Sequence, residues 1–95
     1  MSDLIEGAVA KLRERLPDGF AGLAKFVIEG EGAIMLDATG VRAGDGEADV
    51  TLRASAETFR ALLAGDLDPT RAFMSGGLAI EGSMGLAMKL AAALA

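Results

Sequence analysis

Residues 65–84 read GDLDPTRAFMSGGLAIEGSM, and this stretch decides the fold class that the sequence predicts. Gly65 is expected to end one helix, because glycine readily adopts the left-handed conformation that closes many helices. Asp68-Pro69 starts a second helix, since proline is preferred at the first helical position. Gly76-Gly77 stops that short helix, and residues 78–81 then alternate as a strand. Helix ends and a strand therefore follow one another closely in this part of the chain.

Ser83 is expected to cap a final helix that runs to the end of the chain. Its apolar residues lie around most of its circumference, and Lys89 is its only charge. A helix that is apolar all round must be buried on more than one side. If a sheet covers one side, a bound ligand or a second subunit could cover the other, or alanines could simply be exposed there. Met84 and Met88 would supply flexible surface that adapts to a ligand.

The remainder of the chain predicts one helix, several strands and another helix. Residues 3–16 have an acidic first turn and helical spacing of apolar residues. Alternating apolar residues, separated by glycine turns, predict strands at 20–29, 33–38, 41–43 and 48–54. Ser55 is expected to cap the helix that ends at Gly65.

This element order predicts a single α+β domain spanning residues 1–95. We expect the first four strands to form a meander, in which residues 20–29 and 33–38 make a hairpin. The strand at 78–81 completes a five-stranded, mainly antiparallel sheet, and the helices cover one of its faces.

The composition is rich in apolar residues of small volume. Of the 95 residues, 52% are hydrophobic but only 4% are aromatic, and the chain contains 13 glycines and 19 alanines. Small side chains either allow close helix packing or leave a cavity between the elements that carry them.

The residue types present exclude several kinds of chemistry. Without histidine or cysteine, the chain cannot build a nucleophilic triad or a metal site of imidazole and thiolate ligands. The acidic group Asp45, Glu47 and Asp49 lacks the spacing of a calcium loop and indicates a solvated edge. We therefore expect no catalytic residue, no metal and no cofactor.

The charge of the chain also limits its partners. A net charge of −5 disfavours nucleic acid. The only local basic group, at positions 11, 13 and 15, is interpreted as the solvated face of a helix. The acidic residues near the N-terminus do not fit a secretion signal, and the longest apolar stretch is too short to span a bilayer. We expect a cytoplasmic monomer or homodimer, with transient membrane contact at most.

The chain resembles the sterol carrier protein type 2 family of lipid-binding domains over nearly all of its length, as a stand-alone member of bacterial type. The resemblance rests on the stretches at 26–28, 34–37, 48–52, 55–59, 65–69 and 72–84. The last two are the most specific, with a helix ending in glycine, a helix started by proline, a Phe-Met-x-Gly break and a short strand followed by Gly-x-Met. The resemblance implies an apolar tunnel between the sheet and the helices. It also implies a non-catalytic function, with fatty acyl chains, phospholipids or sterols as ligands.

The leading interpretation is therefore non-catalytic binding and transfer of an apolar ligand, including an isoprenoid lipid, in an internal cavity. The expected ligand-binding residues come from one sheet face and from the helices over it: Phe26, Ile28, Ile34, Leu36, Val50, Leu52, Phe59, Leu62, Leu63, Phe73, Met74, Leu78, Ile80, Met84 and Met88. Any one of these residues could instead belong to the core. The alternatives are an interaction or dimerisation module, accessory to an enzyme of a lipid or quinone pathway, and an enzyme that uses only carboxylates.

Overall fold

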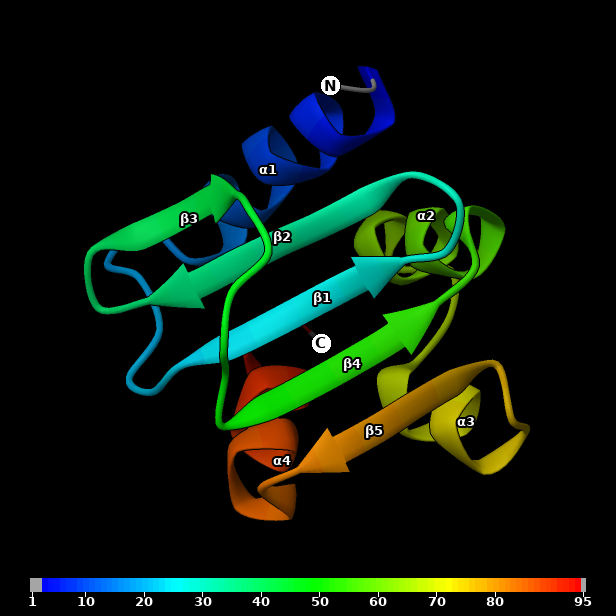
Figure 1. Cartoon of the computed structure of the whole chain (residues 1–95). Coiled ribbons are helices and arrows are strands. Elements are labelled where there is room, and N and C mark those ends of the chain that lie inside the picture. The colour runs from blue at the N-terminus through cyan, green and yellow to red at the C-terminus, as the bar shows by residue number, and fades with distance from the viewer. Residues whose placement is uncertain (1–2, 95) are drawn as a thin grey trace.

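The computed structural model describes residues 3–94 as four helices and five strands (Figure 1). In chain order they are α1 (Asp3–Arg15), β1 (Ala24–Ile28), β2 (Gly32–Asp37), β3 (Gly40–Ala43), β4 (Val50–Ala54), α2 (Ala56–Ala64), α3 (Pro69–Met74), β5 (Leu78–Gly82) and α4 (Met84–Leu94). This order of elements and the α+β class are as predicted. The first strand is shorter than expected, because the chain bends at residues 21–22, where the backbone N–H of Gly22 donates to the carbonyl of Phe20 at 2.9 Å.

The sheet is mixed, with the strand order β3-β2-β1-β4-β5. β1 pairs antiparallel with β2 as the predicted hairpin, β2 with β3 and β4 with β5 are also antiparallel, and β1 with β4 is parallel. The predicted four-strand meander is therefore wrong, because β4 lies beside β1 and not beside β3. Alternating apolar residues show which face of a sheet a side chain lies on, but they do not show which strand is its partner.

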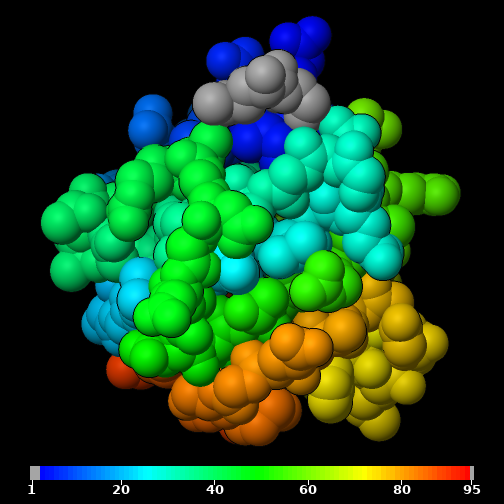
Figure 2. Space-filling view, viewed as in Figure 1, coloured from blue at the N-terminus to red at the C-terminus, as the bar shows by residue number. Residues whose placement is uncertain are grey.

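The connection between β3 and β4 crosses the face of the sheet that carries no helices (Figures 1 and 2). Asp45, in this connection, pairs with Lys25 of β1 at 2.9 Å. Met35 lies on the same face of the sheet but is only 6% exposed. The crossing segment thus brings the chain from one edge of the sheet to the far side of β1, and it partly shields the face over which it runs.

All four helices lie on the other face of the sheet, behind the strands in Figure 1. Their ends follow the predicted local signals. The Ser55 hydroxyl accepts from the backbone N–H of Thr58 at 3.1 Å, and the Ser83 hydroxyl accepts from Leu86 at 3.2 Å. Gly65 ends α2 with φ of 82°, in the left-handed region that favours glycine. Local side-chain chemistry therefore sets these helix boundaries.

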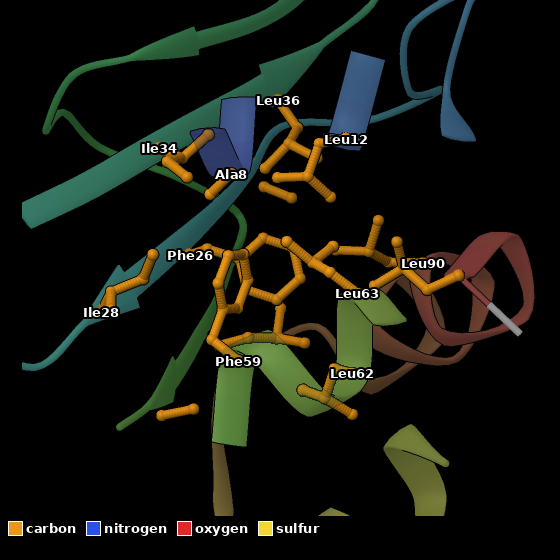
Figure 3. Close-up of a cluster of buried hydrophobic side chains, with 14 of the residues drawn as sticks. Ala8, Leu12, Phe26, Ile28, Ile34, Leu36, Phe59, Leu62, Leu63 and Leu90 are labelled. Atoms are coloured by element: carbon orange, nitrogen blue, oxygen red, sulfur yellow. The ribbon is translucent and has the colours of Figure 1, made fainter. Parts of the chain in front are cut away.

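The core fills the space between the sheet and the helices, as Figure 3 shows. Phe26 of the central strand β1 stands next to Ile34 and Leu52 on the neighbouring strands. Its ring contacts the ring of Phe59 from α2, with centroids 5.0 Å apart at an interplanar angle of 61°. This edge-to-face arrangement is a favoured geometry for aromatic pairs. The pair thus joins the middle of the sheet to the middle of the helical layer.

Arg15 links the ends of three helices. Its guanidinium donates to the carbonyl of Leu94 at 2.7 Å and to that of Leu63 at 3.0 Å. These carbonyls lie at the C-terminal ends of α4 and α2, where a positive charge is favourable. The predicted solvated face is exposed, as expected, at positions 11, 13 and 15. Two of these side chains also make structural contacts, because Arg15 binds the two helix ends and Arg13 donates to the carbonyl of Val41 at 3.0 Å.

Candidate functional site

An apolar groove lies between α3, α4 and the last two strands in the sheet order. Its volume is about 390 Å³, within the range of roughly 300–1,000 Å³ that is usual for small-molecule sites. We call it the α3–α4 groove, and its lining residues are Leu52, Asp68, Pro69, Thr70, Phe73, Leu78, Ile80, Met84, Ala87, Met88, Ala91 and Ala92.

The floor of the groove comes from the sheet. Leu52 of β4 pairs in register with Ile80 of β5, so their side chains lie on the same face of adjacent strands. Leu52 and Leu78 are each 2% exposed, while Ile80 is partly buried. The floor is thus a fixed apolar surface that belongs to the core on one side and to the groove on the other.

One wall of the groove is α4, and its small residues leave the space open. Ala87, Ala91 and Ala92 all line the groove. Residues four apart lie on the same face of a helix, so Ala87 and Ala91 form one short row there. An alanine side chain fills little of the distance to α3. The high alanine content of the chain therefore corresponds, on this helix, to an unfilled space.

The rim of the groove carries unusually exposed apolar side chains. Among residues 3–94, the exposed large hydrophobic residues are Phe73, Met74, Met84 and Met88, at 42%, 80%, 48% and 71%. All four belong to α3 and α4. Three of them line the groove, and Met74 does not. A cluster of exposed large apolar groups marks a site for a ligand, a membrane or a partner.

The polar groups of the groove are few. Asp68 already accepts a hydrogen bond from the backbone N–H of Arg71 at 3.2 Å, as the cap of α3. Thr70 supplies the one hydroxyl among the lining residues. Within residues 3–94, no group of three or more acidic side chains lies close enough together to hold a metal ion. The groove therefore offers apolar contact and little that could take part in proton transfer.

The residues predicted to bind a ligand have three locations in the structure. Six of them line the α3–α4 groove: Leu52, Phe73, Leu78, Ile80, Met84 and Met88. Eight are buried in the core: Phe26, Ile28, Ile34, Leu36, Val50, Phe59, Leu62 and Leu63. Two of these eight, Phe59 and Leu63, also line a second groove between α1 and α2. The last, Met74, is exposed outside the groove.

Several lining residues were not predicted from the sequence. They are the three alanines of α4 and the start of α3, at Asp68, Pro69 and Thr70. Helical spacing gave a usable signal for the alanines, since positions 84, 88, 91 and 92 lie along one side of a helix that contains Met84 and Met88. For the start of α3 no signal was present, because only the packing of α3 beside β5 brings that turn to the groove.

This protein is an α+β domain in which four helices lie on one face of a mixed five-stranded sheet. An open apolar groove lies beside its last helix. The family model described as the SCP-2 sterol transfer family matches residues 4–95. The chain belongs to this family.

Similar proteins place the domain both alone and within longer chains. Hydroxysteroid dehydrogenase-like protein 2 of Danio rerio is 44% identical over 77 residues, covering 73% of this chain and 19% of the relative. The corresponding Xenopus laevis protein is 42% identical over the same length and is covered to 18%. The chain thus spans about a fifth of the length of these curated relatives.

Solved structures share the fold over the whole domain. The solution structure of sterol carrier protein-2 from Aedes aegypti, in complex with the C16 fatty acid palmitate, has a TM-score of 0.79 and 21% identity, covering 100% of this chain and 97% of that one. At this level of identity the likeness shows the fold alone. Among residues 3–94, none of the helices has the length and apolar character needed to cross a membrane.

Proposed function

We propose that this chain is a non-catalytic domain that binds a single apolar lipid chain in the α3–α4 groove and transfers it between surfaces. The observation that carries the proposal is the groove itself, an open space of about 390 Å³ with an apolar floor and a rim of methionine and phenylalanine. Membership of the SCP-2 sterol transfer family supports it. The palmitate bound by the Aedes aegypti protein of the same fold is a ligand of the proposed kind.

The energetics of the groove fit a lipid chain. Burying a methylene gains about 0.8 kcal/mol, so about ten buried methylenes gain about 8 kcal/mol. Association and ordering offset roughly 4 kcal/mol or more of this. The net result is a weak, reversible complex, as transfer requires. Methionines suit this role, because their flexible side chains adapt to chains of different shape.

The proposal places the ligand in the groove and not between Phe26 and Phe59. The space between those rings is already filled, with centroids 5.0 Å apart. A ligand chain there would have to displace core side chains that are 1% exposed. The groove is open without such rearrangement.

The absence of cysteine from the chain fits the reducing conditions of the cytoplasm as its compartment.

The test is ligand titration of Met88→Arg, with Met74→Arg as the matched control. Both methionines are highly exposed, at 71% and 80%, so neither change should affect folding. Only Met88 lines the groove. We expect Met88→Arg to weaken binding of a fluorescent fatty-acid methyl ester about tenfold or more, since a lipid chain that covers the introduced guanidinium must remove it from water. Met74→Arg should bind as the unsubstituted chain does. Equal affinities for the two variants would contradict the groove as the binding site.

A second function is favoured by the same exposed side chains. A patch formed by Phe73, Met74, Met84 and Met88 could pack on a second protein or on a second copy. Its test is native mass spectrometry with lipid extraction, together with the concentration dependence of thermal unfolding. A ligand-free dimer whose melting temperature rises with protein concentration would establish this function. A monomer carrying a stoichiometric lipid would establish the first.

A further inference from the structure

A second groove lies between α1 and α2, and it shares no residue with the α3–α4 groove. Its volume is about 470 Å³. We call it the α1–α2 groove, and its lining residues are Asp3, Leu4, Gly7, Ala8, Lys11, Phe59, Arg60, Leu63 and Ala64. Three of them, Ala8, Phe59 and Leu63, are buried core residues that form an apolar floor. In Figure 3 these three side chains lie between α1 and α2.

Gly7 leaves this groove open. It lies in the interior of α1, where glycine costs about 1 kcal/mol relative to alanine. The backbone does not require glycine here, because Gly7 is not among the residues with positive φ. Packing does not require it either, since a Cβ at this position would meet no atom within 4 Å. The fold therefore accepts a destabilising residue at an exposed helical position that lines the groove.

The two walls of the α1–α2 groove carry cations. Lys11 lies on α1 and Arg60 on α2, and both line the groove. Neither forms an ion pair or a side-chain hydrogen bond with any residue in the range 3–94. By contrast, Lys25 and Arg42 are paired with carboxylates. Asp3 also lines the groove, so its three charged side chains, Asp3, Lys11 and Arg60, sum to a charge of +1 in a chain of net charge −5.

We propose that the α1–α2 groove binds a single-chain amphiphile with an anionic end, of the class of a free long-chain carboxylate. Lys11 and Arg60 would contact the carboxylate, while the apolar tail would lie on the floor formed by Ala8, Phe59 and Leu63. Charge complementarity argues for this ligand over a neutral lipid, and the apolar floor argues for it over a small inorganic anion. The inference does not depend on binding in the α3–α4 groove, because the two sites are made by different residues.

The experiment is a two-dimensional amide NMR titration of the full chain with sodium octanoate and, separately, with 1-octanol. The two probes have the same chain length and differ in charge. We expect octanoate to shift the amide signals of Gly7, Lys11, Arg60 and Ala64 with saturation. The neutral alcohol should shift them only at much higher concentration. Octanoate signals confined to α3, α4 and β5, or equal affinities for the two probes at α1 and α2, would overturn the proposal.

Variants separate the two features of the site. The double substitution Lys11→Gln with Arg60→Gln should weaken octanoate binding at α1–α2 about tenfold, since each exposed charged contact contributes a factor of about three. It should leave octanol unaffected. Gly7→Leu should fill the groove and abolish binding of both probes there, while the melting temperature stays the same or rises. Octanoate affinity unchanged in both variants would refute the site.

Two controls complete the design. Ala10→Leu adds a side chain to an exposed position of the same helix that does not line the groove, so it should leave octanoate binding intact. Met88→Arg changes only the α3–α4 groove and should leave the shifts at α1 and α2 intact. A loss of those shifts in Met88→Arg would show that octanoate occupies a single site at α3–α4, and that result would overturn the second site without affecting the proposed function.

Discussion

Replacing Phe59 by alanine tests whether the centre of the domain is a packed core or a space for ligand. The ring of Phe59 is 1% exposed and contacts Phe26 edge to face at a centroid distance of 5.0 Å. Truncating a buried phenylalanine costs about 3–5 kcal/mol in lost transfer free energy and cavity formation. Part of this cost is the aromatic pair, which contributes about 0.5–1.5 kcal/mol beyond its buried area.

We therefore expect Phe59→Ala to lower the free energy of unfolding by about 4 kcal/mol. Urea denaturation followed by circular dichroism measures this difference, and Phe59→Leu gives a milder variant if the alanine variant does not fold. Phe73→Ala is the matched control. Its ring is 42% exposed, so its loss should cost about 1–2 kcal/mol, roughly half of full side-chain burial.

A small effect at Phe59 would refute the reasoning. If Phe59→Ala cost less than about 1.5 kcal/mol, no more than truncation of the half-exposed Phe73, the ring would not be packed as a core residue. The interior between the sheet and α2 would then have slack that a ligand could occupy. Binding would have to be sought there and not in the α3–α4 groove.

Three further predictions concern single contacts. Ser55→Ala should lower the free energy of unfolding by about 1 kcal/mol in urea denaturation, because the capping bond to Thr58 is lost; an unchanged midpoint would contradict this. Arg15→Ala should lower the free energy of unfolding by about 1–2 kcal/mol and speed amide hydrogen exchange in the last turn of α4, since charged hydrogen bonds to two helix ends are removed. Exchange rates in that turn equal to those of the unsubstituted chain would contradict the helix contact. Hydrogen bonds from Thr39 and the nearby Arg42 guanidinium hold the pKa of the partly buried Asp37 carboxyl below its usual value, so its ionised form favours the folded state. That stabilisation is present at neutral pH and is lost as pH falls through the lowered pKa, and Asp37→Asn should abolish this part of the acid dependence; a pKa of Asp37 at its ordinary value in an NMR titration would contradict it.

The predictions from sequence were most accurate where a few neighbouring residues determine the structure. The caps at Ser55 and Ser83 and the glycine at position 65 set helix ends through hydrogen bonds and backbone angles within one turn. The apolar positions of the strands were also predicted, and the chain places them in the core. These features depend on local geometry and on the spacing of apolar residues, which has different periods in helices and strands and is present in the sequence itself.

The groove shows where such prediction stops. Met84 and Met88 were expected to contact a ligand, whereas the alanines that open the space beside them were not identified. The buried residues around Phe26 have the same apolar character as those that line the groove. Sequence pattern cannot separate a filled interior from an open one, because both need apolar side chains and only the distances between elements tell them apart.

The sequence by itself therefore determined the order of the elements, several helix ends, the apolar faces and the lack of histidine and cysteine chemistry. Only the tertiary structure decided that β4 lies parallel to β1, that Phe26 and Phe59 meet, and that two open grooves remain at α3–α4 and α1–α2. The physical reason is the distance along the chain over which each kind of interaction acts. Caps, turns and periodicity act over a few residues, whereas strand pairing and packing depend on contacts between residues far apart in the chain, whose partners no local pattern specifies.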